Sequence, residues 1–351
     1  MHRRSAFALI LGCMALLPQK TLATTEIPAL FDGRPIGMAG AAAALVDNAT
    51  AVYENPAAMD QIEYLSVTAG VSPFRPENTV PLEGPNTAKS TSAGFFPLFF
   101  AGGAYRLAEP LVVGLGIYPV AGTGAQYSDV SLIGGEDLEF GIVLLEASMP
   151  VSVRLTKWLS VAMGWRVTFM NIQSSNIDPG SGAKVTQDLR GTDVASGQLA
   201  LHLRPYDWLK FGLVYRSKMS IKGSGSTDVG PQSFDTDAQF SQPHALRLGV
   251  AATPIANLNV AADVRYLFYE ESNKNIRVTT QTPAGSMTQV MPQDWQNVAS
   301  VHLGAEYYIR GRVAVRLGYS ATGSATPKHA ANPFTTVNGS THCFGWHGRA
   351  F

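Results

Sequence analysis

The segment LNVAADVRYLFYE, residues 258–270, alternates apolar and polar side chains along most of its length. The apolar set on one face is Leu258, Val260, Ala262, Val264, Tyr266 and Phe268. The other face carries Asn259, Asp263 and Arg265. Successive side chains of a β-strand point to opposite faces of a sheet. The segment therefore predicts a strand with one apolar and one polar face.

The same period of two recurs along the chain, for example at 159–169, 209–219 and 313–319. It predicts eleven strands, and a twelfth in the tail 340–351. The eleven lie near 62–72, 93–105, 111–121, 139–154, 159–172, 193–203, 209–219, 239–252, 258–269, 295–309 and 313–320.

Short and long connections alternate between these strands. Short turns are expected near 106–110, 155–158, 204–208, 253–257 and 310–312, and long polar loops near 74–92, 122–138, 173–192, 220–238 and 270–294. Outer-membrane barrels have short periplasmic turns and long outer loops. A closed sheet also pairs every backbone group, as the bilayer interior demands. The pattern favours an antiparallel transmembrane β-barrel over its alternative, an exported β-sandwich or solenoid.

Composition agrees with this fold class. The chain has 351 residues, with 26 Lys and Arg against 26 Asp and Glu, and only 15% of its residues are charged. A disordered chain would need low hydrophobicity and high net charge. A nucleic-acid binder that relies on a large positive field is also excluded, because the formal net charge is zero.

The N-terminus predicts export. Arg3 and Arg4 precede an apolar run from Ala6 to Leu17, and small residues end at Ala23. These features indicate a secretory signal peptide over residues 1–23. A membrane anchor is disfavoured because it needs about 20 apolar residues. No later apolar run reaches the length of a transmembrane helix. We therefore expect the mature chain in the bacterial outer membrane.

Residues 33–60 differ in kind from the strands, because they are rich in Ala and do not alternate. They predict short helices or compact turns. Since they precede the first strand, they can fold back into the barrel lumen as a plug. The alternative is a loose periplasmic extension. The expected division of the chain is a signal peptide at 1–23, a plug called the hatch at 24–61, and the barrel at 62–351.

Several motifs in this order resemble the FadL family of outer-membrane transporters. In the hatch they are GMAGA at 37–41, DNATAVY at 47–53 and NPAAM at 55–59. In the strands they are KFGLVYRS at 210–217, LRLGVA at 246–251, AADVRY at 261–266, DWQN at 294–297, GAEY at 304–307 and VRLGY at 315–319. The resemblance covers roughly residues 30–325.

The resemblance implies a fourteen-stranded monomeric barrel that admits long-chain fatty acids or similar hydrophobic compounds passively. It implies capture at the outer loops, binding in the lumen and sideways release at a kinked third strand. Outer-membrane lipid and detergent-like amphiphiles are expected partners, and nucleic acid is not. Asn55, Pro56 and Ala57 match the hatch motif and are the expected gating residues.

The expected third strand carries Pro119 in its second half. Proline cannot donate to the hydrogen-bond ladder and is found at edges or bulges. Gly116, Tyr118, Pro119 and Gly122 are therefore the candidate lateral opening. The alternative is that Pro119 merely ends the strand near the loop.

Charged residues on the polar faces should point into the lumen. A buried cation suits a fatty-acid carboxylate through charge-assisted hydrogen bonds. The candidate ligand contacts are Arg166, Arg216, Arg247, Arg265 and Arg316. The alternative is that these arginines pair with inward carboxylates and fill the barrel.

No enzyme motif emerges from the sequence. A Gly-x-Ser-x-Gly elbow is missing, and His342, Cys343 and His347 match no common zinc spacing. We expect neither a cofactor nor a metal. The competing functions are a structural or adhesive surface barrel and, more remotely, a barrel lipid hydrolase. After Tyr319 there is room for at most one further strand, so the C-terminal strands are expected to be incomplete relative to the family.

Overall fold

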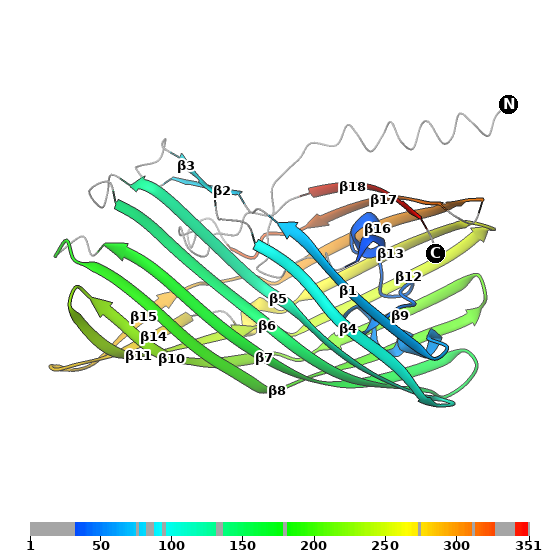
Figure 1. The fold of residues 1–351 in the computed structure, drawn as a ribbon, viewed down its shortest axis with the longest axis horizontal. Helices are drawn as coiled ribbons and strands as arrows, with labels where there is room; N and C mark the ends of the chain where they lie inside the picture. Colours follow the sequence, from blue (N-terminus) through cyan, green and yellow to red (C-terminus); the bar gives the residue numbers. More distant parts are fainter. Residues whose placement is uncertain are drawn as a thin grey trace.

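The computed structural model describes residues 32–74, 77–81, 88–92, 96–130, 136–177, 181–272, 275–310, 313–326 and 341–349. The predicted signal peptide lies outside these residues. The described part is dominated by one large antiparallel sheet that curves into a barrel (Figure 1).

Twelve strands follow one another along the main path of this sheet. They are β1 (Leu65–Phe74), β4 (Phe96–Ala108), β5 (Leu111–Val130), β6 (Glu136–Arg154), β7 (Leu159–Ile177), β8 (Lys184–Tyr206), β9 (Leu209–Arg216), β12 (Ala245–Ile255), β13 (Leu258–Leu267), β16 (Val298–Ile309), β17 (Val313–Thr322) and β18 (Thr341–Arg349). Each of the twelve overlaps a strand predicted from the sequence. Within the described residues the main path thus has twelve strands, where the resemblance implies a barrel of fourteen.

Four further strands extend the sheet beyond the main path. They are β10 (Met219–Val229), β11 (Gln232–Gln242), β14 (Asn275–Thr282) and β15 (Gly285–Pro292). β10 pairs with the first half of β8, and the order then continues through β11 and β14 to β15. We call these four strands with residues 184–191 of β8 the extension sheet. A separate hairpin is formed by β2 (Glu77–Pro81) and β3 (Ala88–Ser92).

The prediction of long polar loops at 173–192, 220–238 and 270–294 was therefore wrong for most of their length, because strands occupy them. These segments are hairpins whose strands pair in register, for example Ser224 with Asp237 and Arg190 with Ser224. Polar residues face outward there and are compatible with strand pairing in water, so a polar composition alone did not separate loop from strand. The prediction that a strand ends near residue 121 was wrong as well, because β5 continues to Val130.

Side chains of the main barrel alternate as predicted. On β7, the side chains of Met163 and Trp165 are 67% and 52% exposed, whereas those of Arg166 and Thr168 are buried. On β13, Val264 is exposed and Asp263 is buried. Apolar residues thus face the lipid and polar residues face the lumen.

In the extension sheet this arrangement is inverted. Leu189 and Ile221 are buried on the lumen side. The opposite face of the same strands carries Asp188, Arg190 and Ser224. The inversion marks the level at which the wall leaves the hydrocarbon and enters an aqueous layer.

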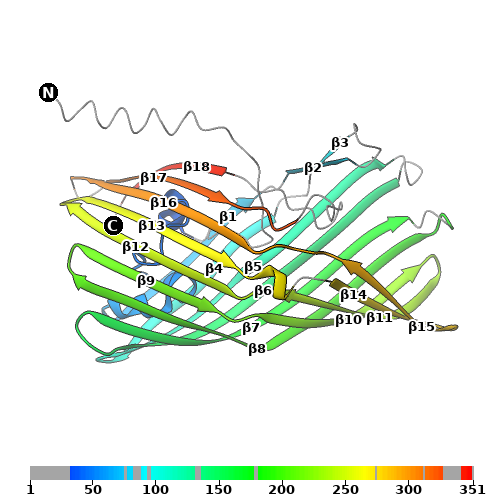
Figure 2. The ribbon, with the colours of Figure 1, turned by 180° about the vertical axis from the view of Figure 1, so that it is seen from behind.

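Three short helical segments form the described part of the hatch. They are α2 (Gly33–Gly37), α3 (Ala51–Glu54) and the 3₁₀ helix η1 (Pro56–Gln61). The only other described helix is the short η3 (Tyr269–Glu271), so no described helix is long and apolar enough to cross a bilayer. Figure 2 shows the hatch, in blue, inside the half of the barrel that carries the short turns. Its side chains Val52, Ala58 and Met59 are fully buried.

Candidate functional site

The predicted gating motif is a junction between the hatch and the barrel wall. The side chain of Asn55 caps η1 by accepting a hydrogen bond from the amide of Ala57, at 3.1 Å. Its Nδ2 donates to the carbonyl of Ala43, at 2.7 Å, and to the carbonyl of Leu201 on β8, at 3.1 Å. Pro56 occupies the first turn of η1, where a missing N–H costs nothing. Asn55 therefore joins two hatch segments and one barrel strand.

A row of inward-facing glycines lets the hatch backbone approach the wall. Gly212 on β9 pairs in register with Gly249 on β12, and Gly304 on β16 pairs with Gly318 on β17. A Cβ atom at Gly212 would overlap the carbonyl group of Ala43. Equivalent atoms at the other three would press on Ala43, Met38 and Ala39. Sequence reasoning missed this row, because glycine gives no alternation signal.

A buried ion-pair cluster holds the middle of the hatch. Arg247 on β12 contacts Glu54 of α3 and lies 2.7 Å from the carboxylate of Asp263 on β13. The same Asp263 oxygen accepts hydrogen bonds from the backbone amides of Ala42 and Ala43, each at 3.0 Å. Complete burial raises the pKa of the Glu54 carboxyl, and the facing guanidinium of Arg247 offsets only part of that rise.

A second cluster holds the start of the hatch. Arg34 in α2 reaches Glu306 on β16 at 2.8 Å and Asp47 at 2.7 Å. Arg316 on β17 binds the other oxygen of Glu306 at 2.6 Å. Arg247 and Arg316, two of the predicted ligand contacts, are thus paired with carboxylates. Arg265 pairs in register with Arg247 and so faces the lumen too.

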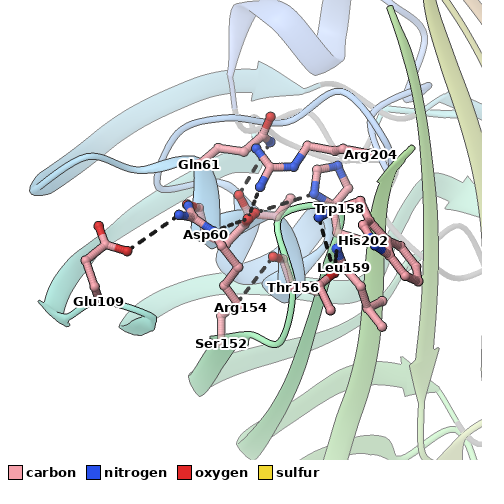
Figure 3. A network of polar contacts seen from close by, with 12 residues as sticks. Asp60, Gln61, Glu109, Ser152, Arg154, Thr156, Trp158, Leu159, His202 and Arg204 are labelled. Carbon is pink, nitrogen blue, oxygen red and sulfur yellow. Dashed lines mark hydrogen bonds and ion pairs between the residues drawn. The ribbon is translucent and has the colours of Figure 1, made fainter. Parts of the chain in front are cut away.

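A third cluster, drawn in Figure 3, holds the end of the hatch. The Asp60 carboxylate contacts Arg154 at the end of β6 and Arg204 at the end of β8. His202 lies with Nδ1 3.5 Å from the other carboxylate oxygen, and Arg106 donates to the Asp60 carbonyl at 2.6 Å. We call Asp60 and these partners the latch.

The charge state of the latch follows from its geometry. Burial alone would raise the pKa of the Asp60 carboxyl, but the imidazole of His202 and the guanidinium of Arg204 outweigh it. They hold that pKa below its usual range, so Asp60 is ionised at neutral pH. The side chains of Arg154 and Arg204 are each about a quarter exposed, which places the latch next to the aqueous mouth with the short turns.

The remaining predicted arginines meet at one carboxylate above the hatch. Glu146 on β6 binds Arg166 of β7 at 3.0 Å and Arg216 of β9 at 2.5 Å. Tyr118 of β5 donates its hydroxyl to Glu146 at 2.9 Å. Among the described residues, one carboxylate thus faces two guanidinium groups, and this cluster carries an excess positive charge. The guanidinium of Arg216 also lies over the ring of Tyr53 in the hatch, 5.0 Å from its centroid.

The predicted lateral opening falls where β4 and β5 part. Their pairing runs from Ala108 with Leu111 to Ala101 with Ile117, and no described pair continues beyond it. From Tyr118 to Val130 the described pairing of β5 is with β6 alone, with a register shift between Pro119 and Ala121. Gly122 follows this shift. The proline thus lies at a bulge inside a long strand and does not end it.

Apolar side chains surround the lumen beside this parting. Tyr118 stacks on Phe100 of β4 at 5.7 Å and meets Tyr53 of the hatch edge-on at 5.0 Å. Gly116 faces Val52 of the hatch, and a Cβ there would touch it. Further members of the cluster are Val120, Ala121, Ile142, Leu144, Met170, Met219, Ile221 and Phe240.

The described residues offer no candidate metal-binding site. Among the described residues, no three His, Cys, Asp or Glu side chains are grouped so that they could hold a metal ion. The side chains of His342, Cys343 and His347 are outside the described set.

Comparison with known proteins gives a consistent result. The model of a family described as outer membrane protein transport protein (OMPP1/FadL/TodX) matches residues 31–335. A search of curated proteins found no significant match. Among solved structures, the Pseudomonas putida toluene transporter TodX has a TM-score of 0.74 at 16% identity, covering 95% of this chain and 91% of that one.

Two further structures share the fold. A Pseudomonas aeruginosa FadL homologue has a TM-score of 0.71 at 14% identity, with 89% of this chain and 84% of that chain covered. The Ralstonia pickettii toluene transporter TbuX has a TM-score of 0.69 at 19% identity, with 83% and 86% covered.

Proposed function

The chain belongs to the OMPP1/FadL/TodX family of outer-membrane transport proteins, and from this premise we propose that it admits long-chain fatty acids or similar hydrophobic compounds by passive diffusion. Members of this family are channels for hydrophobic compounds and not enzymes. The proposal adds a substrate class, a binding region and an exit. It also includes the division into a leader at 1–23, a hatch at 24–61 and a monomeric barrel at 62–351.

The extension sheet supports capture on the outer side. Its lumen face bears Leu189, Ile221 and Phe240, while its outer face is polar. An apolar interior above the membrane offers a hydrophobic molecule a place to leave water. From there the apolar cluster beside Tyr118 continues down to the hatch.

The excess positive charge of the Glu146 cluster is the reason for proposing a long-chain carboxylate as the substrate. Arg166 and Arg216 share one carboxylate, and both lie against the apolar lumen through Tyr118 and Tyr53. A long-chain carboxylate would place its acyl chain along the cluster and its anion toward the surplus guanidinium charge. An aliphatic hydrocarbon gains nothing from that charge, and an aromatic one gains only a cation–π attraction.

A monoaromatic hydrocarbon is the second candidate. The aromatic rings of Phe100, Tyr118, Tyr127 and Phe240 are all buried around the lumen. Aromatic pairs contribute roughly 0.5–1.5 kcal/mol beyond their buried area. The toluene transporters TodX and TbuX and the monoaromatic hydrocarbon channel CymD have the same fold.

Lateral release through the parting of β4 and β5 is the proposed exit. The β4–β5 ladder ends at Ala101 with Ile117, whereas β5 itself continues to Val130, and this parting is the proposed gap in the wall. Pro119 lacks the N–H that a ladder would need, and the bulge turns the strand away. The apolar lumen cluster lies directly beside it.

Uptake by cells tests both substrate and exit. Labelled oleate and labelled toluene would be supplied to a transporter-deficient strain that expresses the chain. We expect oleate uptake to exceed toluene uptake relative to the empty vector. Ala121→Trp places a large ring at the parting and should lower uptake at least fivefold. Ala195→Trp, at an exposed position on β8, is the matched control and should leave uptake unchanged.

The outcomes separate the parts of the proposal. Equal uptake by Ala121→Trp and wild type, with both barrels inserted, would contradict the lateral exit. Toluene uptake without oleate uptake would replace the fatty-acid assignment by the aromatic one. No uptake of either compound by an inserted barrel would favour a structural role.

A further inference from the structure

The outer face of the extension sheet is built differently from the lipid-facing belt below it. Along β7 the outward side chains change from Met163, Trp165 and Phe169 to Asn171 and Gln173 in a single step. Phe169 pairs with Thr192, and the next outward pair is Asn171 with Arg190. At about 3.3 Å per residue, Arg190 lies roughly 7 Å along the strand beyond the last aromatic side chain.

This distance places the face in the headgroup layer. The polar layer of a bilayer is about 5–8 Å deep on each side of the hydrocarbon. β10 and β11 then continue the polar face sideways with Lys222, Ser224 and Asp237. The surface is therefore continuous with the lipid-facing belt and is level with the headgroups of the outer leaflet.

A concave site of about 760 Å³ lies on this face. Its lining includes Asp188, Arg190, Ser224, Ser226, Asp235 and Asp237. The volume falls within the range of about 300–1,000 Å³ that is usual for ligand pockets. Every one of these side chains is polar, which is unsuitable for an acyl chain and suitable for a hydroxyl-rich ligand.

The two cations of the face are held loosely. Arg190 pairs with Asp188 at 3.2 Å, and Lys222 pairs with Asp237 at 2.9 Å; both cationic side chains are at least 70% exposed. Exposed pairs of this kind contribute little, about 0–1 kcal/mol. Arg190 and Lys222 are thus available to a phosphate, which guanidinium and ammonium groups bind well.

The carboxylates of this face favour a ligand that carries hydroxyl groups as well as phosphate. Asp235 is exposed and takes part in no described hydrogen bond or ion pair, so its carboxylate is available to accept hydrogen bonds from sugar hydroxyls. Ser224 already donates to Asp237 at 2.6 Å and can accept in turn. Cationic groups and hydrogen-bond acceptors thus lie side by side on this outer face: Arg190 and Asp235 line the concave site, and Lys222 lies outside its lining, paired with Asp237.

We propose that this face binds the phosphorylated sugar headgroup of the outer-leaflet glycolipid, with Arg190 and Lys222 on phosphate and Asp235 on sugar hydroxyls. The site is separate from the lumen and does not depend on the transported compound. It would fix the height of the barrel in the membrane and hold the extension sheet against the lipid surface.

Binding of purified lipid to the full-length protein in detergent tests the proposal. The probes are a rough-type lipopolysaccharide, the same glycolipid after removal of its phosphates, and phosphatidylglycerol as an anionic lipid without sugar. Bound lipid would be counted by native mass spectrometry. The expected order of affinity is lipopolysaccharide first, with each of the other two at least fivefold weaker.

Variants test whether Arg190 and Lys222 bind the phosphate. The double variant Arg190→Ala with Lys222→Ala should weaken lipopolysaccharide binding at least fivefold. The control Lys157→Ala with Arg310→Ala removes two exposed cations at the opposite end and should not change it. If the double variant does not insert, Arg190→Gln alone should still weaken binding about threefold.

Three results would overturn the proposal. One is equal binding of lipopolysaccharide and phosphatidylglycerol by the wild type. Another is unchanged binding after removal of the phosphates. The third is equal loss in the double variant and in its control. Oleate uptake is measured separately, so a failure here leaves the transport proposal standing.

Discussion

Replacement of Asp60 by Asn would test whether the latch keeps the hatch in place. Asn has nearly the same shape but no charge, so Arg154 and Arg204 would lose the carboxylate they share. Among the described residues, only the exposed Glu109, 3.5 Å from Arg154, would remain as a counter-ion. Breaking a fully buried ion pair costs about 3–5 kcal/mol. Both arginines are partly exposed, and the hydrogen bonds to the Asp60 carbonyl remain. We therefore expect a loss of about 2 kcal/mol, below the range for a fully buried pair.

This energy has a measurable consequence. The barrel wall does not depend on Asp60, so the loss should appear in the docking equilibrium of the hatch. At 1.4 kcal/mol per factor of ten, 2 kcal/mol raises the undocked fraction about thirtyfold. Single-channel recordings in planar bilayers should show a correspondingly higher frequency of open events. Heat-modifiable gel mobility should stay that of a folded barrel.

Asp47→Asn is the matched control. Asp47 is also a hatch carboxylate that pairs with an arginine, but its side chain is 52% exposed. Exposed pairs contribute at most about 1 kcal/mol. Identical open-event frequencies in Asp60→Asn and wild type, or equal increases in both variants, would refute the reasoning about the latch.

Three other predictions concern the hatch. Gly212→Val should expose the hatch to protease, because its side chain would overlap the Ala43 carbonyl. Gly141→Val should not, because a Cβ there meets only the Gln173 carbonyl, at the ordinary contact distance of 4.0 Å; equal digestion of the two variants would contradict this. Asn55→Ala should lower oleate uptake without lowering barrel abundance on gels, because it removes the bonds to Ala43 and β8. Since the pKa of Asp60 is lowered in the folded state, its contribution is complete above about pH 4 and is lost as pH falls further. Protease resistance of the hatch should thus be constant from pH 8 to 5 and decline only below pH 4, and a decline near pH 6 would point to another group.

The barrel strands could be predicted because their two faces meet different environments, lipid on the outside and a polar lumen on the inside. Lipid outside and polar lumen inside impose a period of two, which is plain around Val264 and Asp263. The extension sheet could not be predicted in the same way. Its outer face is polar, and its lumen residues, such as Ile221 and Phe240, are too sparse among Gly and Ser to give a clear period.

The site was predictable only in part. Individual lumen arginines could be named from their strand faces, but their partners could not. Arg247 binds Glu54, 193 positions away, and Arg204 binds Asp60, 144 positions away. Such pairs depend on how the hatch enters the barrel, and a single sequence holds no information on that register. The candidate ligand role of these arginines remains a prediction.

The central claim is that this chain admits a hydrophobic carboxylate across the outer membrane. The initial rate of labelled-oleate uptake tests it most directly, in a transporter-deficient strain with the chain or with an empty vector. Insertion would be verified by heat-modifiable mobility of the same membranes. The account predicts saturable uptake well above the vector. A rate equal to the vector, from cells whose outer membrane contains the folded barrel, would contradict it.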